Sequence, residues 1–414
     1  MRNILDVAII GSGASGLCSA VSIKSRDRSI SVAVFEQLSR VGKKLLVTGN
    51  GRCNITNRII DKASYHSEND GFFEYALNRY DNLYTENFFA DIGIVFTFEG
   101  DKAYPYSLQA SSVVDALRFA CDEMGVITHT DTPVTDIKKN KDLFTVKANG
   151  IEYTARTVIV AGGLLSGGEK LGSNGSAYRI MKNKGYKTVA LSPAIVQIKT
   201  DNLLTKSLKG IKVNAKAKLT LNGKTIRTEE GEVLFCDYGL SGPPILQLSR
   251  EISRQSGEFS VSLDLMPEYS FENICDLLSY RVSVLRNRKA EEFFTGMLNK
   301  RVGQAVVKLA GIKLSDNVAE FSVADIKKMA NIIKNIQFKV LSTTGFDNSQ
   351  VTAGGISTKE FDEKTMMSKK EKGLFCVGEI LDVDGDCGGF NLQWAWSSSF
   401  AATDGVLEYL EDIL

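Results

Sequence analysis

The chain has 414 residues, of which 43% are hydrophobic and 24% are charged. This balance is typical of a globular protein with about two to three domains, and it excludes a mainly disordered, collagen-like or coiled-coil chain. Fifty Lys and Arg residues against 49 Asp and Glu residues leave a formal net charge of +1. Because nucleic-acid-binding proteins usually carry a basic excess, we expect a small-molecule substrate and no nucleic-acid partner.

The first motif in the chain is a glycine turn between two predicted strands. The apolar run DVAII is followed by Gly11, Gly13 and Gly16, then by a helical pattern and a second apolar run, SVAVF, that ends at Glu36. Dinucleotide binding requires this context, because the turn and the helix N-terminus approach a pyrophosphate. Glu36 can accept hydrogen bonds from ribose hydroxyls and disfavours a 2′-phosphate, so FAD or NAD fits better than NADP. The alternative is a glycine turn in another α/β fold.

A polar loop rich in Gly and Asn, VGKKLLVTGNGRCNITN, follows at residues 41–57. Beside a dinucleotide motif, such a loop can wrap the larger second half of a cofactor, which FAD has and NAD lacks. An ordinary surface loop is the alternative. Ala161 and Gly162, at the end of the later apolar run TVIVA, are expected to reach the same cofactor from a strand end.

Between these motifs the chain alternates predicted helices and short strands. Helical periodicity covers residues 72–92 and 110–124. The short strands are expected near residues 126–129, 133–137, 143–147 and 151–154, with a separate strand at 157–161.

The pattern changes at about residue 192, where alternating strands and an Asn-Gly hairpin signal begin. We expect an antiparallel β-barrel at 192–270, to which 336–346 returns, and a helical subdomain at 271–335. The α/β pattern resumes at 347–414. Residues 1–191 and 347–414 are therefore predicted to form one FAD-binding domain around an insertion.

The C-terminal segment carries a second group of candidate cofactor ligands. An apolar run ends in Gly378 and Glu379, and a flavin ribityl chain needs such a pair, because the acid accepts from a hydroxyl and the glycine permits close approach. Gly389 then leads into a helix predicted from about Asn391. Its N-terminus would stabilise negative charge at the pyrimidine edge of a reduced flavin.

Cysteine and histidine usage argues against a metal centre. The seven Cys residues form no C-x-x-C pair and the chain has two His residues, so we expect neither a metal site nor a disulfide framework. Cys387 is expected to be a small buried residue rather than a redox group. No apolar stretch approaches ~18 residues and no signal-peptide pattern is visible, so we expect a cytoplasmic chain without a membrane span.

Several motifs together resemble a known family. They read DVAIIGSGASGL, GKKLLVTGNGRCNITN, AYPYSLQASSVVDAL, VIVAGG, GEVLFCDYGLSGPPILQLS and the long run from VTAGGIST to GGFNLQWAWSSS. On these residues the chain resembles the YhiN-like (BaiN-type) NAD(P)/FAD-dependent oxidoreductases, which include aminoacetone oxidase-like flavoproteins. The resemblance implies a glutathione-reductase-type, Rossmann-like α/β domain that binds FAD, with an inserted antiparallel β-barrel and a helical subdomain.

The resemblance also implies which residues bind FAD. The ADP half would be held by Gly11, Gly13, Ala14, Ser15, Gly16, Glu36 and Gln37, and adenine would meet the backbone of Val134. The ribityl and isoalloxazine half would be lined by Lys43, Thr48, Asn50, Gly51, Arg52, Cys53 and Asn54. The residues that would close the flavin site are Gly378, Glu379, Gly389, Asn391 and Leu392.

The chain departs from the family pattern at three places. Its glycine loop reads Thr-Gly-Asn-Gly instead of Ser-Gly-Gly-Gly, and VIVAGG lacks the Thr of the usual Ala-Thr-Gly-Gly. In addition, Phe235-Cys236-Asp237 stands where the family usually has Phe-Thr-His. Without that His, no acid–base role is carried over, and the catalytic acid is not identified. Motif position alone suggests the candidates Tyr104, Tyr106, Asp237 and Tyr238.

The leading hypothesis for function is an FAD-dependent reductase of an activated C=C bond in a hydrophobic, bile-acid-like enone. Hydride from flavin N5 would reach the β-carbon and a protein acid would protonate the α-carbon. The chain has no second dinucleotide motif, so NADH or NADPH would dock transiently as the electron donor. One alternative is an oxidase of a small amine such as aminoacetone, which would release hydrogen peroxide. Another is an FAD-binding module of an RNA-modifying complex.

Overall fold

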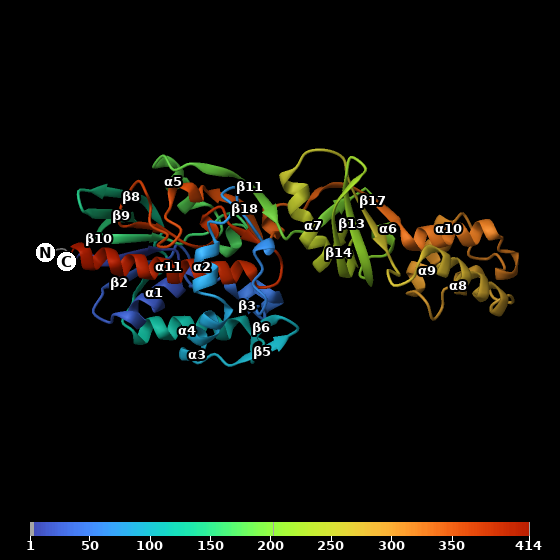
Figure 1. Ribbon diagram of the computed structural model, residues 1–414, viewed down its shortest axis with the longest axis horizontal. Helices are drawn as coiled ribbons and strands as arrows, with labels where there is room; N and C mark the ends of the chain where they lie inside the picture. Colours follow the sequence, from blue (N-terminus) through green and yellow to red (C-terminus); the bar gives the residue numbers. More distant parts are fainter. Residues whose placement is uncertain (1–3, 202, 414) are drawn as a thin grey trace. The chain divides into compact units, whose positions relative to one another are not determined.

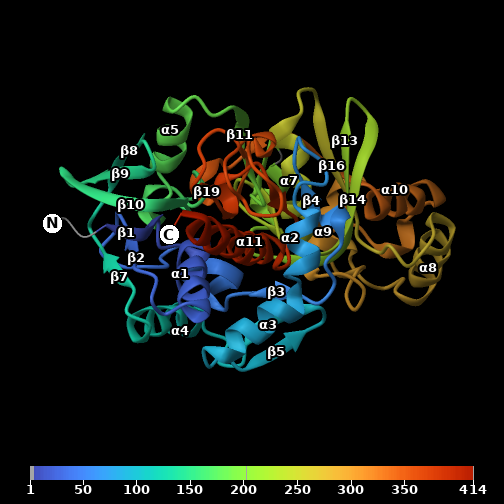
Figure 2. The same ribbon diagram turned by 60° about the vertical axis from the view of Figure 1, so that its left-hand side comes forward.

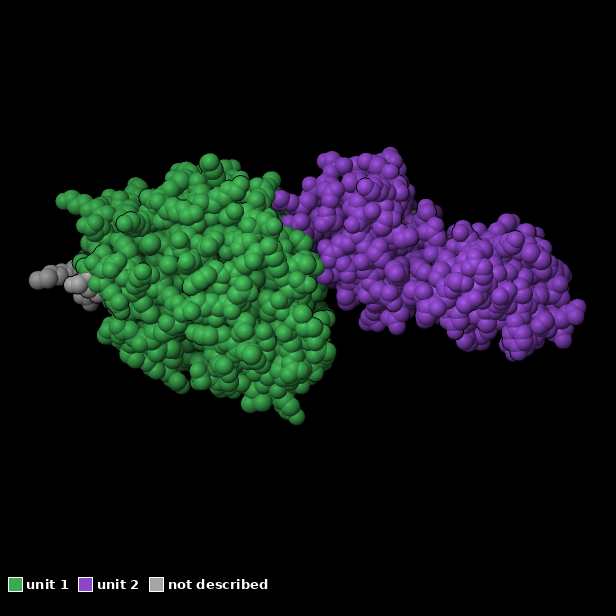
Figure 3. Space-filling view, viewed as in Figure 1, with its two compact units in different colours: residues 1–193, 346–414 green, residues 194–345 purple. Residues whose placement is uncertain are grey.

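The computed structural model describes residues 4–201 and 203–413 (Figure 1). The chain forms two compact units, each with its own hydrophobic core (Figure 3). Unit 1 combines residues 1–193 with residues 346–414, and unit 2 comprises residues 194–345. The two ends of the chain therefore build one unit, and the second unit is inserted into it.

A seven-stranded sheet forms the centre of the described part of unit 1. Its strands lie in the order β7 (Ile127–His129), β2 (Val32–Phe35), β1 (Leu5–Ile10), β10 (Ile151–Val160), β9 (Leu143–Ala148) and β8 (Val134–Asn140), with β19 (Leu374–Cys376) also paired to β10. The β7, β2, β1, β10 and β19 pairings are parallel, and β9 pairs antiparallel with β10 and β8. Parallel strands covered on both faces are apolar throughout, which explains the continuous run in β1.

The prediction of two separate strands at 151–154 and 157–161 is wrong, because the single strand β10 runs from Ile151 to Val160. Its first half pairs with β9, and its second half pairs with β1 and β19. The residues between the predicted strands are held in the extended sheet by Asp6. Arg156 Nε donates to Asp6 Oδ1 at 3.1 Å, and the Thr157 hydroxyl donates to the Asp6 carbonyl at 2.7 Å.

Helices α1 (Ala14–Arg26), α4 (Ala110–Glu123) and α11 (Phe390–Ile413) pack beside this sheet, with α1 lying against both others (Figure 2). The helix predicted at 72–92 is instead two helices, α2 (Glu74–Arg79) and α3 (Asn82–Asp91). The break follows from a cap, because the Asp81 side chain accepts from Tyr84 N at 2.9 Å and so begins α3. The remaining helix of unit 1, among its described α-helices, is α5 (Ser176–Asn183).

Short strands form further small sheets in the described part of unit 1. Strand β6 (Lys102–Pro105) pairs with both β3 (Thr56–Asn57) and β5 (Phe96–Glu99), β4 (Tyr65–His66) pairs with β20 (Asp384–Gly385), and β11 (Thr188–Ala194) pairs with β18 (Val351–Ile356). The β4–β20 and β11–β18 pairs each join segments that are far apart in the sequence.

Unit 2 contains a closed barrel among its described residues. Its strands lie in the order β12 (Ile198–Thr200), β15 (Gly239–Ser241), β14 (Lys224–Phe235), β13 (Lys212–Leu221), β16 (Phe259–Asp264) and β17 (Ile336–Thr343), and β17 pairs with β12. Asn222 (φ 50°) and Gly223 (φ 81°) form the turn between β13 and β14, as the hairpin signal predicts.

The helices of unit 2 are α6 (Leu203–Ser207), α7 (Pro243–Arg254), α8 (Phe271–Val284), α9 (Lys300–Leu309) and α10 (Val323–Lys334). Helices α7, α8, α9 and α10 share one buried core with the barrel, which includes Leu263 and Phe338 of the strands and Ile333 of α10. None of the helices in the described part of the chain combines the length and apolar character that a bilayer crossing demands.

Candidate functional site

The glycine motif is closely packed at its first and third positions and open at its second. A Cβ added to Gly16 would lie 1.9 Å from the Gly11 carbonyl oxygen, and one added to Gly11, at φ +99°, would lie 2.8 Å from the Ala161 oxygen. A Cβ on Gly13 would meet nothing within 4 Å. The turn therefore keeps helix α1 close to the strands while leaving space beside Gly13 for a ligand group.

The predicted residues that follow β10 and β19 lie against this glycine turn. Ala161 N donates to the Ile10 oxygen at 2.8 Å, which places Ala161 and Gly162 beside Gly11. Gly378, at φ +71°, packs on Ser15, because a Cβ there would lie 2.7 Å from Ser15 Oγ. The predicted residues Ala14 and Ser15 begin α1 at this junction.

Glu36 is held at the end of β2 by three donors. Its Oε2 accepts from the Ser12 hydroxyl at 2.6 Å and from Ser12 N at 2.9 Å, and its Oε1 accepts from Leu38 N at 2.9 Å. Ser12 was not among the predicted site residues, because it has no distinguishing signal in the sequence apart from its place between two motif glycines. The carboxylate is thus fixed beside the glycine turn, where an adenosine ribose lies in dinucleotide sites.

Two other predicted residues lie near Glu36. The Gln37 side chain donates to the Gly172 oxygen at 2.6 Å and accepts from Asn174 Nδ2 at 2.8 Å, so it joins the end of β2 to the loop before α5. Val134 is buried at the start of β8. Two residues earlier in the chain, Thr132 N donates a hydrogen bond to the Glu36 backbone oxygen at 2.7 Å, which holds this segment near Glu36.

The loop after β2 has an unusual backbone. Asn50 (φ 57°) and Cys53 (φ 59°) are left-handed although neither is glycine, and Gly49 between Thr48 and Asn50 is left-handed too. Such conformations cost about 1–3 kcal/mol each and concentrate at ligand sites. Cys53 is fully buried, and burial raises the pKa of its thiol to about 12, so it is not a nucleophile at neutral pH.

The other predicted residues of this loop divide by exposure. Lys43, Asn50 and Gly51 are exposed, whereas Arg52 is partly covered. The Arg52 guanidinium lies 4.6 Å from the centre of the Tyr104 ring and forms an ion pair of 2.7 Å with Glu99. The loop is thereby joined to β5 and β6.

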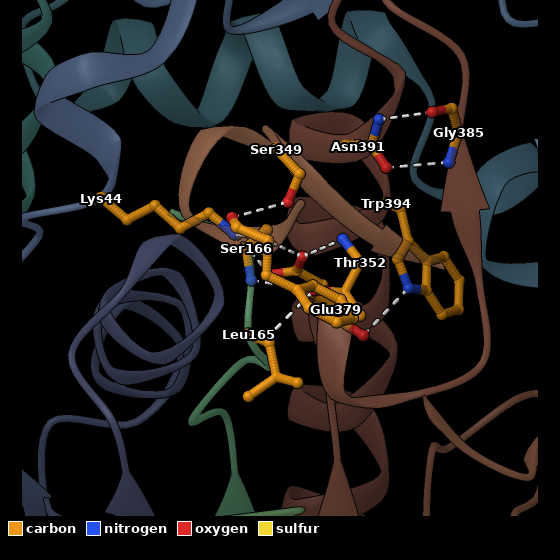
Figure 4. A network of polar contacts seen from close by, with 11 residues as sticks. Lys44, Leu165, Ser166, Ser349, Thr352, Glu379, Gly385, Asn391 and Trp394 are labelled. Atoms are coloured by element: carbon orange, nitrogen blue, oxygen red, sulfur yellow. Dashed lines mark hydrogen bonds and ion pairs between the residues drawn. The ribbon is translucent and has the colours of Figure 1, made fainter. Parts of the chain in front are cut away.

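Glu379 is the centre of a polar network that draws on four segments of unit 1 (Figure 4). Lys44 Nζ lies 2.6 Å from its Oε2, while Ser166 Oγ and Thr352 N donate to its Oε1 at 2.6 and 2.8 Å. Thr352 Oγ1 in turn accepts from Ser166 N at 2.9 Å. The predicted acid is therefore positioned by residues from the β2 loop, the β10 loop and β18.

Lys44, Ser166 and Thr352 were all missed by the sequence analysis, which selected Lys43 from the Lys-Lys pair. The two lysines differ in burial and not in local sequence, since Lys43 is exposed and Lys44 is partly buried. No sequence signal separates them, because the partner of Lys44 is 335 residues away.

The N-terminal end of α11 meets the same loop. Gly389 has φ +99°, and a Cβ there would lie 2.7 Å from the Thr56 carbonyl carbon. The Asn54 Oδ1 beside it is buried and has no hydrogen-bond partner among the described residues. The Asn391 side chain forms two hydrogen bonds with the backbone of Gly385 (Figure 4). Its Oδ1 accepts from Gly385 N at 2.8 Å, and its Nδ2 donates to the Gly385 oxygen at 2.6 Å. Leu392 is partly buried in the first turn.

The four candidate acids lie in different places. Tyr104 is 4% exposed on β6 next to Arg52, and burial raises the pKa of its hydroxyl. Tyr106 is 71% exposed. Asp237 and Tyr238 belong to unit 2, where the Lys209 ammonium, 2.6 Å from the Asp237 carboxylate, lowers the pKa of that carboxyl. Within unit 1, the fold brings Tyr104 to the predicted flavin loop.

Within the described residues, no cluster of three or more His, Cys, Asp or Glu side chains has the arrangement of a metal site. Cys387 lies just before the α11 glycines, and burial raises the pKa of its thiol. The tryptophans Trp394 and Trp396 of α11 are buried at 1% and 0% exposure, as expected for core residues.

Comparison with known families agrees with this architecture. Residues 5–405 match the family described as HI0933-like protein Rossmann domain. The chain belongs to this family. Its resemblance to the YhiN-like flavoproteins is thereby confirmed, as is the expected fold, a Rossmann-type FAD-binding domain with an inserted barrel and helices.

Two relatives match over nearly the whole chain. The 3-dehydro-bile acid delta(4,6)-reductase of Clostridium scindens is 33% identical over 406 residues, which is 97% of this chain and 99% of the relative. A ribosomal RNA dihydrouridine synthase of Haemophilus influenzae is 30% identical over 412 residues, covering 97% and 98%. Together with the fold, these relatives establish that this member of the HI0933-like family is an FAD-dependent oxidoreductase.

Solved structures share the fold at low identity. A flavocytochrome c3 fumarate reductase has a TM-score of 0.50 at 14% identity, covering 98% of this chain and 78% of its own. A 3-ketosteroid-delta4-(5alpha)-dehydrogenase from Rhodococcus jostii RHA1 also has a TM-score of 0.50 at 14% identity, covering 99% and 100%. These likenesses extend the family assignment to a flavoenzyme fold.

The residues present fit FAD on three observations. Space is open at Gly13, where a pyrophosphate would approach, and the Glu36 carboxylate is fixed at the end of β2. At the N-terminal end of α11, no described residue donates a hydrogen bond to the buried Asn54 Oδ1. Because an unpaired buried acceptor costs about 1–3 kcal/mol, a ligand N–H or O–H at that place would stabilise the site.

Proposed function

We propose that this chain reduces a C=C bond conjugated to a carbonyl group, in a hydrophobic enone of the bile-acid type. The observation that carries this proposal is the end-to-end similarity to a reductase of a 3-dehydro-bile acid, at 33% identity over 97% of the chain. The electron donor is proposed to be NADH or NADPH, which would bind transiently, since the chain has one glycine dinucleotide motif.

In this proposal the two halves of FAD lie on the two groups of residues described above. The ADP half would lie on the glycine turn, Glu36 and Gln37, with adenine at Val134. The ribityl and ring half would lie between the residue 43–54 loop, Gly378, Glu379 and the start of α11. When bound, FAD supplies hydride to the substrate.

The residues of this chain would contribute positioning and charge. Glu379 has both oxygens engaged by Lys44, Ser166 and Thr352, so it would present a fixed carboxylate to a ribityl hydroxyl. The N-terminus of α11 would place backbone N–H groups and the positive end of its dipole at the pyrimidine edge. Both arrangements need no rearrangement when the cofactor becomes more negative.

An anaerobic experiment tests the proposal. Purified holoenzyme is titrated with NADH and with NADPH while the flavin absorbance near ~450 nm is followed. The reduced enzyme is then mixed with a 3-oxo-Δ4 steroid. Bleaching by one nucleotide, and recovery of the absorbance with formation of the saturated ketone, are expected. A reduced flavin that no enone reoxidises would sink the enone proposal.

A second candidate is the reduction of a uracil ring in ribosomal RNA, as the name of the Haemophilus influenzae relative indicates for that protein. The C5=C6 bond of uracil is conjugated to the C4 carbonyl, so the bond chemistry is the same. The distribution of formal charge between the two units favours this second candidate. Unit 2 has 22 Lys and Arg residues against 16 Asp and Glu residues, so +6 of formal charge lies there and −5 lies on unit 1.

Although the formal net charge of the whole chain is close to zero, the inserted unit 2 is basic. This weakens the expectation that the chain has no nucleic-acid partner. A polyanion would be attracted to unit 2, and its affinity would fall steeply with salt. Binding of a ribosomal RNA fragment is measured between ~50 and ~200 mM salt, followed by analysis of the RNA for dihydrouridine. Salt-dependent binding with dihydrouridine formation selects this candidate, and absence of both removes it.

A further inference from the structure

A short strand is fixed over the loop that precedes α11. Strand β4 pairs antiparallel with β20, with His66 opposite Asp384 and Tyr65 opposite Gly385. The Tyr65 hydroxyl donates to the Phe390 oxygen at 3.1 Å. In addition, Asp386 N donates to the Ser64 oxygen at 2.8 Å. The segment that carries His66 is therefore attached to the first residues of α11, at the predicted flavin end of the site.

His66 is paired with an acid from this loop. Its Nε2 lies 3.2 Å from Asp386 Oδ1, and the two side chains are 23% and 15% exposed. The other ring nitrogen, Nδ1, forms no hydrogen bond with any described residue. One nitrogen is thus oriented by a carboxylate while the other is available, an arrangement that suits proton transfer to a bound molecule.

The second histidine of the chain is in a different environment. His129 lies on β7, its ring stacked on Phe35 at 5.1 Å and tilted against Tyr153 at 5.4 Å. Its backbone oxygen accepts from Glu36 N, which places it at the predicted ribose end. Of the two His residues in the sequence, His66 is therefore the one attached to the α11 loop.

We propose that His66 is the proton donor of the reduction and that Asp386 is its positioning residue. This inference rests on the proposed function. Hydride addition forms a C–H bond at the β-carbon and moves the π electron pair onto the enolate. The Nδ1–H bond of His66 then breaks, its proton bonds to the α-carbon, and Nδ1 regains a proton from water. The substrate gains one hydride and one proton in total.

The proposal differs from the sequence-based choice of Tyr104. That tyrosine is buried under Arg52. In contrast, His66 is partly exposed, and its Nδ1 has no hydrogen-bond partner among residues 4–201 and 203–413. The Tyr104→Phe variant removes a hydroxyl without removing the ring, so it is a matched comparison for His66→Gln.

The test uses reduced holoenzyme in anaerobic stopped-flow mixing. The substrate is whichever of the 3-oxo-Δ4 steroid and the ribosomal RNA fragment the wild type reduces. His66→Gln is expected to slow flavin reoxidation by about 100-fold or more, and Asp386→Asn by about tenfold. Tyr104→Phe, which removes the competing candidate acid, should slow reoxidation less than His66→Gln does. Reoxidation by ferricyanide, FAD content and reduction by nicotinamide should be unchanged in His66→Gln and Asp386→Asn.

Product analysis in D2O separates a proton donor from a structural residue. The wild type should place deuterium on one face of the α-carbon, and His66→Gln should place it on both faces because water then protonates the enolate. External imidazole should restore part of the rate to His66→Ala. If His66→Gln reacts at the full rate and still places deuterium on one face, the inference about His66 is overturned, while the proposed function is not affected. A wild type that reduces neither substrate overturns the proposed function, and the inference with it.

Discussion

Lys44 and Glu379 lie 335 residues apart in the sequence, and their side chains meet with Nζ 2.6 Å from Oε2. The ion pair connects the loop after β2 with the residues after β19, which come from the two ends of the chain. Ser166 and Thr352 occupy the other oxygen of the same carboxylate. The predicted flavin site is thus assembled around an acid that three further segments hold in place.

Lys44→Met is expected to weaken FAD binding by about tenfold, because Glu379 loses its cationic partner and reorients. The pair is partly exposed, at 27% and 20%, so a larger effect is not expected. Titration of apoprotein with FAD, followed by flavin fluorescence, measures the dissociation constant. Lys43→Met is the matched comparison, since Lys43 is exposed and its loss leaves the ion pair between Lys44 and Glu379 intact. It should weaken FAD binding less than Lys44→Met does. Equal effects of both variants would contradict this assignment.

The glycine turn provides a second pair of variants. Gly16→Ala places a methyl group 1.9 Å from the Gly11 oxygen, whereas Gly13→Ala finds open space. We expect Gly16→Ala to destabilise the apoprotein by several kcal/mol, as overpacking against backbone does. Gly13→Ala should leave the melting temperature of the apoprotein unchanged but weaken FAD binding at least about tenfold, because the methyl group occupies the pyrophosphate space. Tight FAD binding by Gly13→Ala would place the cofactor elsewhere.

Asn54 and Asn57 allow a test of the unpaired acceptor. In the part of the chain that the structure describes, Asn54 Oδ1 is buried without a partner. By contrast, Asn57 donates to the Gly388 oxygen at 2.9 Å and accepts from Ile59 N at 2.9 Å. Asn54→Leu should raise the melting temperature of the apoprotein by about 2–4 °C and lower FAD affinity. Asn57→Leu should lower that temperature, since it breaks two satisfied bonds. A destabilised Asn54→Leu apoprotein would refute the unpaired state.

Unit 2 should fold without unit 1. Its core is separate, and its first and last barrel strands pair, with Ile198 opposite Thr343. A fragment of residues 194–345 is expected to unfold in urea in one cooperative transition. Phe338→Ala, which empties a fully buried position, should lower its stability by about 3–5 kcal/mol. A fragment with no transition in near-ultraviolet circular dichroism would show that its core depends on unit 1.

Several features were predictable because they depend on local sequence. The glycine turn, the acid that ends the second strand and the Asn-Gly hairpin are each dictated by backbone conformations that few residues adopt. The alternation of β13 and β14 likewise predicts a sheet with one buried face. The sequence by itself therefore determined the Rossmann-type domain, the inserted barrel and the cofactor class.

The tertiary structure decided which side chains meet. Lys43 and Lys44 are equivalent in local sequence, and Lys44 is distinguished by an acid near the other end of the chain. Strand β10 is one strand instead of two because neighbouring strands pair with it along its whole length, β9 with its first half and β1 with its second half. The pairing of His66 with Asp386, 320 residues apart, has no local signal either. Local rules act over a few residues, whereas a site at the edge of a sheet is built from loops whose proximity depends on the folding of the whole unit.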